Sequence, residues 1–334
     1  MSRRRKRLLV VVAILVAVVA AMFLGARWWE RAYIAALHVR LNDPDPYARV
    51  KAASRLGRAG EVEVAVPFLL QEAVAGRRRQ GPDAIEGLRK IGAPAVPLLI
   101  ERLDDDDRVL RGCVSEALAG MGEPAVAALA DCRKHENPVV RKDATWALSR
   151  MGPPAVPALI PYLDDENFSI RWQACGALAL IGPPAEPAVP KLMELLDDEA
   201  WEVRIAAARA LGRIGELETA LSVLTDFLSH HSSTRRWHAA GALGSIGEAA
   251  APTVPELTAL LSDDSEHVRL VAAGALGKIG PAAAPAVPEL TELLSDEWMP
   301  VRKAAGEALG KIQGGPRAGA RRLGDGRGPV GRTG

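Results

Sequence analysis

A three-residue pattern recurs along most of this chain and constrains its fold more than any other feature. An Arg is followed by a Leu seven residues later and by a Gly eleven residues later, as in Arg204, Leu211 and Gly215. The pattern occurs nine times between about residues 46 and 313, at intervals of 30–33 residues. A repeat of this length predicts a solenoid of stacked helical units, a fold that usually presents a surface for binding.

The register of the repeat is set by taking the Arg as position zero. Leu at plus seven is present in every copy, and Gly at plus eleven is missing only from the last, where Gln313 stands. The second copy departs from the pattern, because Gly81 replaces the Arg and follows Arg77, Arg78 and Arg79. The arginines at position zero are Arg49, Arg111, Arg141, Arg171, Arg204, Arg236, Arg269 and Arg302.

Within each copy the spacing of apolar and small residues predicts an α-helix. They stand at minus one, plus three, plus seven and plus ten, as in Val268, Ala272, Leu276 and Ile279. Spacings of four, four and three place these side chains on one face of a helix. The Gly at plus eleven is expected to end this helix in the left-handed conformation that Gly adopts at least cost.

A second helix is expected after each Gly. Its sequence, as in Ala188-Val189-Pro190, puts Pro in the first turn, where its missing N–H has no partner to lose. Acidic turns such as Asp197 to Glu199 follow and are expected to cap the next helix. Asp104 to Asp107 is interpreted in the same way, because it lacks the spaced ligands and closing Glu of a calcium loop. Each copy is therefore predicted to be an antiparallel helical hairpin.

These motifs resemble HEAT repeats, in particular the short bacterial kind named from phycobilisome lyases. Val203-Arg204 to Gly215 and Val268-Arg269 to Gly280 carry the resemblance, which covers about residues 46–313 with a weaker opening helix at 31–42. It implies an all-α fold: a right-handed α-solenoid of about nine HEAT-like hairpins over residues 30–313, with the second helix of each hairpin on the concave face. It says little about function, because the family serves many purposes.

The N-terminal segment predicts a membrane anchor. Residues 1–7 carry five basic side chains, and residues 8–26 carry no charge. Those nineteen residues span roughly 28 Å as a helix, close to the thickness of a bilayer core. We expect one transmembrane signal anchor at 8–29, with residues 1–7 in the cytoplasm and the solenoid outside it, facing the periplasm if the source is bacterial. A cleaved signal peptide is the alternative.

The charge distribution argues against a nucleic-acid partner. The chain has a formal charge of +1, but residues 2–7 contribute +5 and residues 314–334 contribute +4, which leaves about −8 on residues 8–313. A net acidic solenoid is poorly suited to a phosphate backbone. The Gly/Arg-rich segment 314–334 is predicted to be disordered, with a polyanion contact as the alternative. Arg77 to Arg79, with Arg89 and Lys90, are interpreted as a solvated loop, with an anion site as the alternative.

The sequence has few residues that could form a catalytic centre or a metal site. One His-Glu pair, His135-Glu136, cannot fill the coordination sphere of a metal, and His230-His231 fall in a polar turn. No phosphate loop, nucleophile elbow or Cys–His pair stands in a credible context. Cys113, Cys132 and Cys175 are interpreted as small packing residues, with a Cys113–Cys132 bridge left open. We therefore expect no cofactor, no metal and no small-molecule substrate.

Residues that differ between copies are the better candidates for a site. Trp146 stands at plus five, and Trp172 and Trp237 stand at plus one, on the side of the helix away from the plus-seven Leu. Trp is enriched at binding hot spots, and Trp146 and Trp172 come from adjacent copies. The alternative is that these rings fill gaps beside Gly176 and Gly241. The predicted partner-binding residues are Trp146, Trp172, Trp237, Arg150, Arg209 and Arg213.

The sequence thus predicts a membrane-anchored HEAT-repeat scaffold or adaptor that binds a protein or peptide on its concave face and the bilayer through residues 8–29. An enzyme or enzyme subunit of the HEAT-like lyase or oxidoreductase type is the main alternative. A spacer that organises the cell envelope is a third.

Overall fold

The computed structural model of the protein describes residues 28–76 and 81–314. Within these two ranges the regular structure is helical and no residue lies in a β-strand, as the sequence pattern predicts. The predicted anchor up to residue 27, Arg77 to Arg79 and the tail from residue 315 lie outside the described residues. The predictions made for them therefore stay predictions.

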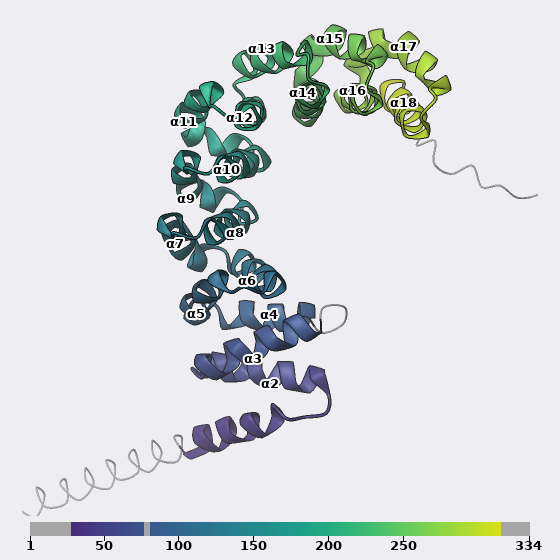
Figure 1. Ribbon diagram of the computed structural model, residues 1–334. Helices are drawn as coiled ribbons and strands as arrows, with labels where there is room; N and C mark the ends of the chain where they lie inside the picture. The colour runs from purple at the N-terminus through teal and green to yellow at the C-terminus, as the bar shows by residue number, and fades with distance from the viewer. Residues whose placement is uncertain (1–27, 77–80, 315–334) are drawn as a thin grey trace, which may run out of the picture. The chain divides into compact units, whose positions relative to one another are not determined.

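The chain divides into two compact units, Met1–Ala158 and Leu159–Gly334. The first described residues of this unit, 28–40, are helical, so the opening helix ends two residues before the predicted 31–42 segment does. Its other helices are α2 (Pro46–Arg58), α3 (Val62–Ala75), α4 (Gly81–Ile91), α5 (Val96–Glu101), α6 (Arg108–Met121), α7 (Glu123–Asp131) and α8 (Pro138–Ser149). Figure 1 shows α4, α6 and α8 in one layer and α5 and α7 in a second layer beside it.

The second unit repeats this two-layer arrangement. Its first layer holds α10 (Phe168–Ile181), α12 (Trp201–Ile214), α14 (Ser233–Ile246), α16 (Glu266–Ile279) and α18 (Met299–Ile312). Its second layer holds α11 (Val189–Glu194), α13 (Leu217–Leu228), α15 (Val254–Ala259) and α17 (Val287–Glu292) (Figure 1). The short α9 (Val156–Leu159) spans the boundary between the units.

We call the helices that carry position zero the Arg helices, and those between them the companion helices. The Arg helices are α2, α4, α6, α8, α10, α12, α14, α16 and α18, with Gly81 at position zero of α4. Except for α13, the companion helices after α3 are short and are extended by 3-10 turns, as at Leu195–Asp197 after α11. Pro190 lies in the first turn of α11, where the sequence places it.

The repeated residues explain why the hairpins stack. The plus-seven Leu is fully buried in most copies, as for Leu211 and Leu243, and packs between neighbouring helices. The plus-eleven Gly ends the Arg helix with a positive φ, as predicted, but its ψ is not that of the left-handed helix: Gly280 has φ 79° and ψ −143°. In the last copy Gln313 keeps a φ of −83°, and Gly314 takes the positive φ of 68° instead.

Small residues allow adjacent Arg helices to approach closely. A Cβ added to Gly244 would lie 2.9 Å from the Cα of Ala275, and one added to Gly277 would lie 2.8 Å from the Cα of Ala308. The resulting core of the second unit is continuous from Ile205 to Ile312. Fixed contacts of this kind make the Arg helices a rigid support for the side chains on their outer face.

One stretch of the described residues, 266–295, is long and apolar enough to cross a bilayer. It comprises α16, the turn after it and α17, and it contributes Ala272, Leu276 and Leu290 to the core of the second unit. Since 44% of its most apolar window is already buried within the protein, its hydropathy is explained by the packing of one repeat.

Candidate functional site

The repeated arginines form a ladder of ion pairs along the second unit. Arg171 donates from Nε to Asp198 Oδ2 at 2.7 Å and from Nη2 to Asp198 Oδ1 at 2.8 Å, so that one hairpin is tied to the next. Its Nη1 also donates to the backbone carbonyl of Asp165 at 2.8 Å. The pairs Arg236–Asp263 and Arg269–Asp296 repeat this geometry. Bidentate pairs of this kind are among the stronger polar contacts in proteins.

The electrostatics of the ladder follow from these contacts. The hydrogen bond from Arg269 lowers the pKa of Asp296 more than burial raises it. The hydrogen bond to Asp198 likewise raises the pKa of Arg171. Because these residues recur from copy to copy, they belong to the scaffold. Residues that differ between copies must supply a specific site.

The three predicted tryptophans are partly exposed on the Arg helices. Their exposed fractions are 38% for Trp146, 45% for Trp172 and 38% for Trp237. Other side chains occupy the gaps that these rings might have filled. An ideal Cβ at Gly176 would lie 3.2 Å from Arg209 Nη2, and one at Gly241 would lie 3.7 Å from a methyl of Val271.

Trp146 belongs to the first unit, whereas Trp172 and Trp237 belong to the second. The joint patch of Trp146 and Trp172 therefore remains a prediction. What the structure shows is three half-exposed indole rings, each on an Arg helix and each at a position that differs between copies.

The three predicted arginines have different surroundings. The Arg150 guanidinium lies 5.4 Å from the centre of the Trp146 ring, within range of a cation–π contact. Arg213 donates to the carbonyls of Ala179 at 3.4 Å and Ser245 at 3.3 Å, which links the ends of α10 and α14. Burial lowers the pKa of Arg209. Arg150 thus accompanies an exposed tryptophan, whereas Arg209 and Arg213 pack against neighbouring helices.

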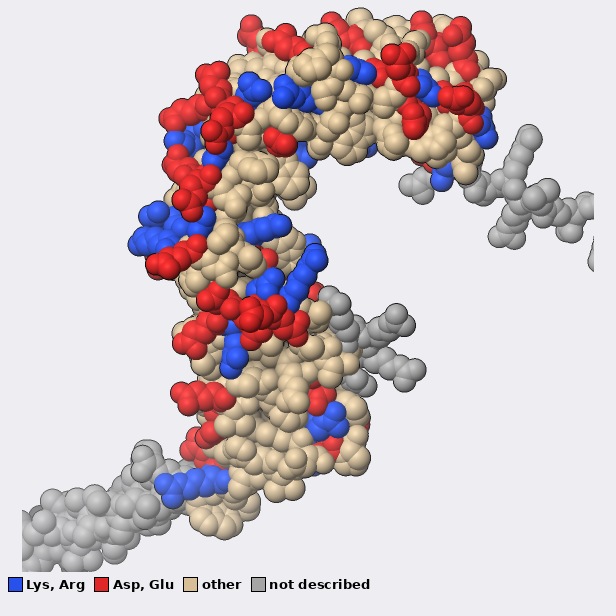
Figure 2. All heavy atoms as spheres, in the orientation of Figure 1, with Lys and Arg blue, Asp and Glu red and all other residues tan. Residues whose placement is uncertain are grey.

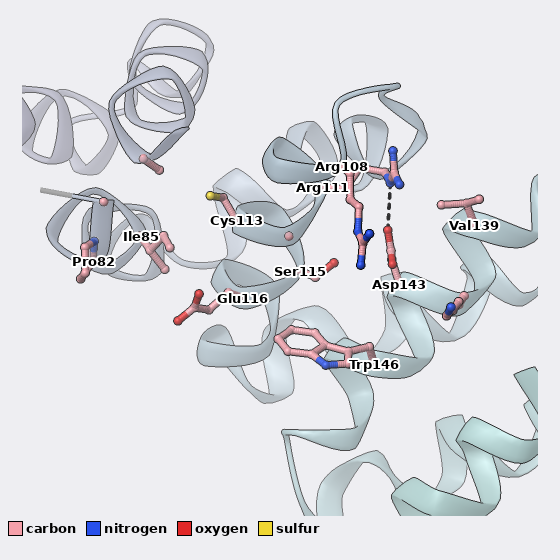
Figure 3. Close-up of a pocket in the computed structure, with 14 residues that line it drawn as sticks. Pro82, Ile85, Arg108, Arg111, Cys113, Ser115, Glu116, Val139, Asp143 and Trp146 are labelled. Atoms are coloured by element: carbon pink, nitrogen blue, oxygen red, sulfur yellow. Dashed lines mark hydrogen bonds and ion pairs between the residues drawn. The ribbon is translucent and has the colours of Figure 1, made fainter. Parts of the chain in front are cut away.

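A hollow of about 750 Å³ lies among α3, α4, α6 and α8 in the first unit. Gly81, which stands at the position where other copies carry an Arg, lines one side of it. Figure 3 shows Trp146 and the ion pair of Arg111 and Asp143 on one side of the hollow, with Ile85 on the other. The sequence locates the irregular second copy, but it does not reveal this hollow, because the lining residues come from four separate helices.

The hollow is lined by an ion pair and by apolar and aromatic side chains. Arg111 Nε donates to Asp143 Oδ2 at 3.1 Å, so the two charges compensate each other. Ile85 and Trp146 add apolar and aromatic surface, and the buried Ser115 Oγ has no hydrogen-bond partner. These features fit a peptide side chain that brings its own polar group.

No metal centre or disulfide is found in the described ranges, 28–76 and 81–314. No group of three or more His, Cys, Asp or Glu there is placed to hold a metal ion. Cys113 and Cys132 form no disulfide, so that alternative is wrong. Burial raises the pKa of Cys132 to about 11 and that of Cys175 to about 12, which keeps both as packed thiols.

The basic residues near the second copy are neutralised where the structure describes them. Arg89 lies 3.7 Å from carboxylate oxygens of both Glu86 and Glu116, and Lys90 lies 3.5 Å from Glu86. These two cations are therefore already paired with acidic groups. They give no support to an anion site.

Comparison with known proteins identifies the repeat family and structures with a similar fold. The family model of HEAT repeats matches residues 83–149, 126–199, 189–254 and 254–321. No curated protein is significantly similar to the sequence. Among solved structures, a mutant of Kap121p is similar with a TM-score of 0.54 and 16% identity, covering 84% of this chain and 37% of that one.

Two further structures are similar at lower TM-scores. The complex of CpcE and CpcF of phycocyanin lyase from Nostoc sp. PCC7120 has a TM-score of 0.44 and 22% identity, covering 79% of this chain and 94% of that one. An engineered protein has a TM-score of 0.43 and 22% identity, covering 85% and 89%. Since the matches to the family model together extend over most of the chain, this protein belongs to the HEAT-repeat family.

Proposed function

We propose that this chain is a membrane-anchored HEAT-repeat scaffold that binds a protein or peptide partner along its Arg helices, which carry the half-exposed tryptophans. The observation that carries the proposal is the half-exposed Trp146, with Arg150 over its ring and a hollow beside it. Large aromatic side chains on a rigid support lose little conformational entropy on binding, which suits them to hot spots.

The anchor is the second part of the proposal. The nineteen uncharged residues at 8–26, preceded by five basic residues, support a single span with a cytoplasmic N-terminus. The solenoid then stands outside the cytoplasm and presents its Arg helices to partners close to the membrane surface. Labelling of single engineered cysteines at residues 2 and 330 with a membrane-impermeant reagent in intact cells tests this. The proposed topology predicts labelling at 330 only.

Partner capture tests the binding role. The full-length chain is cross-linked in its native membrane and the captured proteins are identified by mass spectrometry. Replacing both Trp146 and Trp172 with Ala should reduce capture of the partner at least tenfold, because hot-spot rings commonly contribute about 2 kcal/mol or more each. Leu294→Ala is the matched control, since this apolar side chain is 43% exposed but lies outside the Arg helices. Equal capture by all three proteins would rule out the tryptophans as the binding surface.

We also propose that the chain has no catalytic activity of its own. Catalysis of the HEAT-like oxidoreductase type requires convergent metal ligands, and the described residues hold no such group. Metal analysis of the purified full-length chain should therefore give no stoichiometric iron or zinc. A full equivalent of either metal would replace the scaffold proposal with an enzymatic one.

A further inference from the structure

The turn before each Arg helix contains the position on which the ladder depends. Six residues before position zero stands the carboxylate that receives the Arg of the preceding copy, as Asp198, Asp263 and Asp296 do. The same side chain accepts the backbone N–H two residues later, at 2.8–2.9 Å. In two copies this position holds a histidine, His135 or His230. A neutral imidazole can preserve the turn, but it cannot replace the negative charge.

At His135 the missing charge is compensated within the protein. His135 Nδ1 accepts the N–H of Asn137 at 3.1 Å, which keeps the turn. Arg111, the position-zero Arg of the preceding copy, donates to Asp143 on α8 instead. The Arg111 guanidinium is therefore paired although the turn has no aspartate at this position.

At His230 the missing charge is not compensated. His230 Nδ1 accepts the N–H of Ser232 at 3.0 Å, so the turn again survives. Arg204, however, has no ion pair or hydrogen bond within the part of the chain that the structure describes, and its Nε is buried without an acceptor. Its guanidinium lies 5.4 Å from the centre of the Phe227 ring. A buried guanidinium N–H without an acceptor is costly, and a bound carboxylate would relieve that cost.

The surroundings of Arg204 are cationic and aromatic. Arg235 Nη1 lies 2.8 Å from His230 Nε2, and the Arg235 guanidinium lies 5.5 Å from the Trp201 ring centre. Burial, then His231 and Arg235, lower the pKa of His230, which leaves its ring neutral at pH 7.

The two ladder aspartates of this region are hydrogen-bonded to other arginines, although Asp198 also interacts electrostatically with Arg204. Asp198 is held by Arg171 at 2.7 Å, and Asp263 is held by Arg236 at 2.6 Å. Among the described residues, neither Arg204 nor Arg235 forms an ion pair with a carboxylate, and an aromatic ring lies beside each guanidinium group.

We infer that Arg204 and Arg235 form a docking site for a carboxylate of an acidic peptide segment of the partner, which takes the place of the missing ladder aspartate. This inference rests on the proposed protein-binding function and names the chemistry of the partner. The flat faces of Phe227 and Trp201 lie beside the two guanidinium groups and suit the aliphatic part of a Glu or Asp side chain.

The charge of the surrounding surface favours a peptide over a nucleic acid. Figure 2 shows Asp and Glu side chains gathered over the companion helices of the second unit. A phosphate backbone carries one charge every few ångströms and would meet this acidic surface, whereas a single peptide carboxylate needs only the local pair of arginines.

The chain itself supplies a matched pair of variants to test the inference. His230→Asp restores the residue that the regular copies carry, so Arg204 gains an internal partner and the site is filled. His135→Asp makes the same change where Arg111 is already paired with Asp143. Both variants use a residue that this turn accepts elsewhere in the chain, so both are expected to fold.

The probe is a displayed library of random dodecapeptides, selected on the full-length chain in detergent micelles. The wild-type chain should enrich peptides with Asp or Glu at a fixed place. The best such peptide should bind at least roughly tenfold more weakly to His230→Asp and to Arg204→Met, as expected for loss of a charge-assisted hydrogen bond. Binding to His135→Asp should equal that to wild type. Replacing the acidic residue of the peptide with Gln should cause the same loss as His230→Asp.

The other outcomes separate this inference from the function on which it rests. Enriched peptides without an acidic residue, which bind His230→Asp as well as wild type but lose affinity with Trp146→Ala, would leave the scaffold function standing and overturn the carboxylate site. An equal loss with His135→Asp, or a single-stranded oligonucleotide that competes through Arg204, would also overturn it. Failure to enrich any peptide, together with failure to capture any partner, would overturn both.

Discussion

The position-zero arginines have different partners in the two units. In the first unit, Arg49 pairs with Glu72 on α3 at 2.8 Å and Arg111 pairs with Asp143 on α8 at 3.1 Å, so irregular turns are compensated by other carboxylates. In the second unit, Arg171, Arg236 and Arg269 all use the turn aspartate, whereas Arg204 contacts the Phe227 ring and forms no ion pair or hydrogen bond with the described residues. Where another carboxylate of the chain pairs with the Arg in place of the turn aspartate, the change in the ladder is structural variation. Where no described carboxylate does so, as at Arg204, the unpaired guanidinium points to a partner outside the chain.

The largest expected effect comes from breaking a regular pair and a compensated pair in parallel. Asp263→Ala leaves the largely buried Arg236 without its bidentate acceptor and should cost about 2–3 kcal/mol in the free energy of unfolding. Asp143→Ala removes a more exposed, single contact of Arg111 and should cost about 1 kcal/mol or less. Urea denaturation of the full-length chain, followed by circular dichroism, measures both. A larger loss for Asp143→Ala would show that the irregular unit depends more on its ladder than the regular one.

A smaller effect distinguishes the tryptophans of the two units. Trp146→Ala in the first unit and Trp237→Ala in the second should each weaken partner binding by about 1–2 kcal/mol and leave the unfolding midpoint nearly unchanged, because each ring is 38% exposed. Titration of the captured partner by calorimetry gives the two values. If only one variant loses affinity, the partner contacts one unit alone. If unfolding shifts as much as binding, the rings serve packing.

Placing an aspartate at position 230, as in the regular copies, should stabilise the second unit. His230→Asp gives Arg204 the acceptor that Arg171 has, so the thermal midpoint of the full-length chain should rise. His135→Asp should leave the midpoint unchanged, because Arg111 is already paired. Differential scanning calorimetry compares the two. A midpoint that falls with His230→Asp would mean that Arg204 is not placed to use the restored carboxylate.

The smallest effect is a pH dependence that belongs to the second unit. Burial lowers the pKa of both His230 and His238 below 6.5. Near pH 6.5 the unfolded chain therefore binds more protons than the folded chain. The free energy of unfolding should then fall as pH drops from about 6.5 towards the lowered pKa values. His230→Asn should remove part of this loss between pH 7.5 and 5.5, as measured by urea midpoints. An unchanged slope would show that His230 does not contribute to it.

Much of the scaffold was predictable from the sequence. The plus-seven Leu and plus-eleven Gly act through local geometry, since one sits on the buried helix face and the other needs a positive φ. The predicted hairpins and helix ends are therefore confirmed. The surroundings of the candidate site were not predictable. Gly176 suggested a gap for a tryptophan, but Arg209 from the next Arg helix lies against it.

The sequence by itself determined that this chain is a stack of helical hairpins, where each helix ends, and which residues repeat. Only the tertiary structure decided which arginines find a carboxylate, because the pairs join residues 23 or more positions apart. His135 and His230 look alike in the sequence. Packing brings Asp143 to Arg111 and leaves Arg204 over Phe227 without an acceptor. The physical reason is that helix formation depends on neighbours along the chain, whereas the pairing of a charge depends on whatever group the fold brings within hydrogen-bond distance.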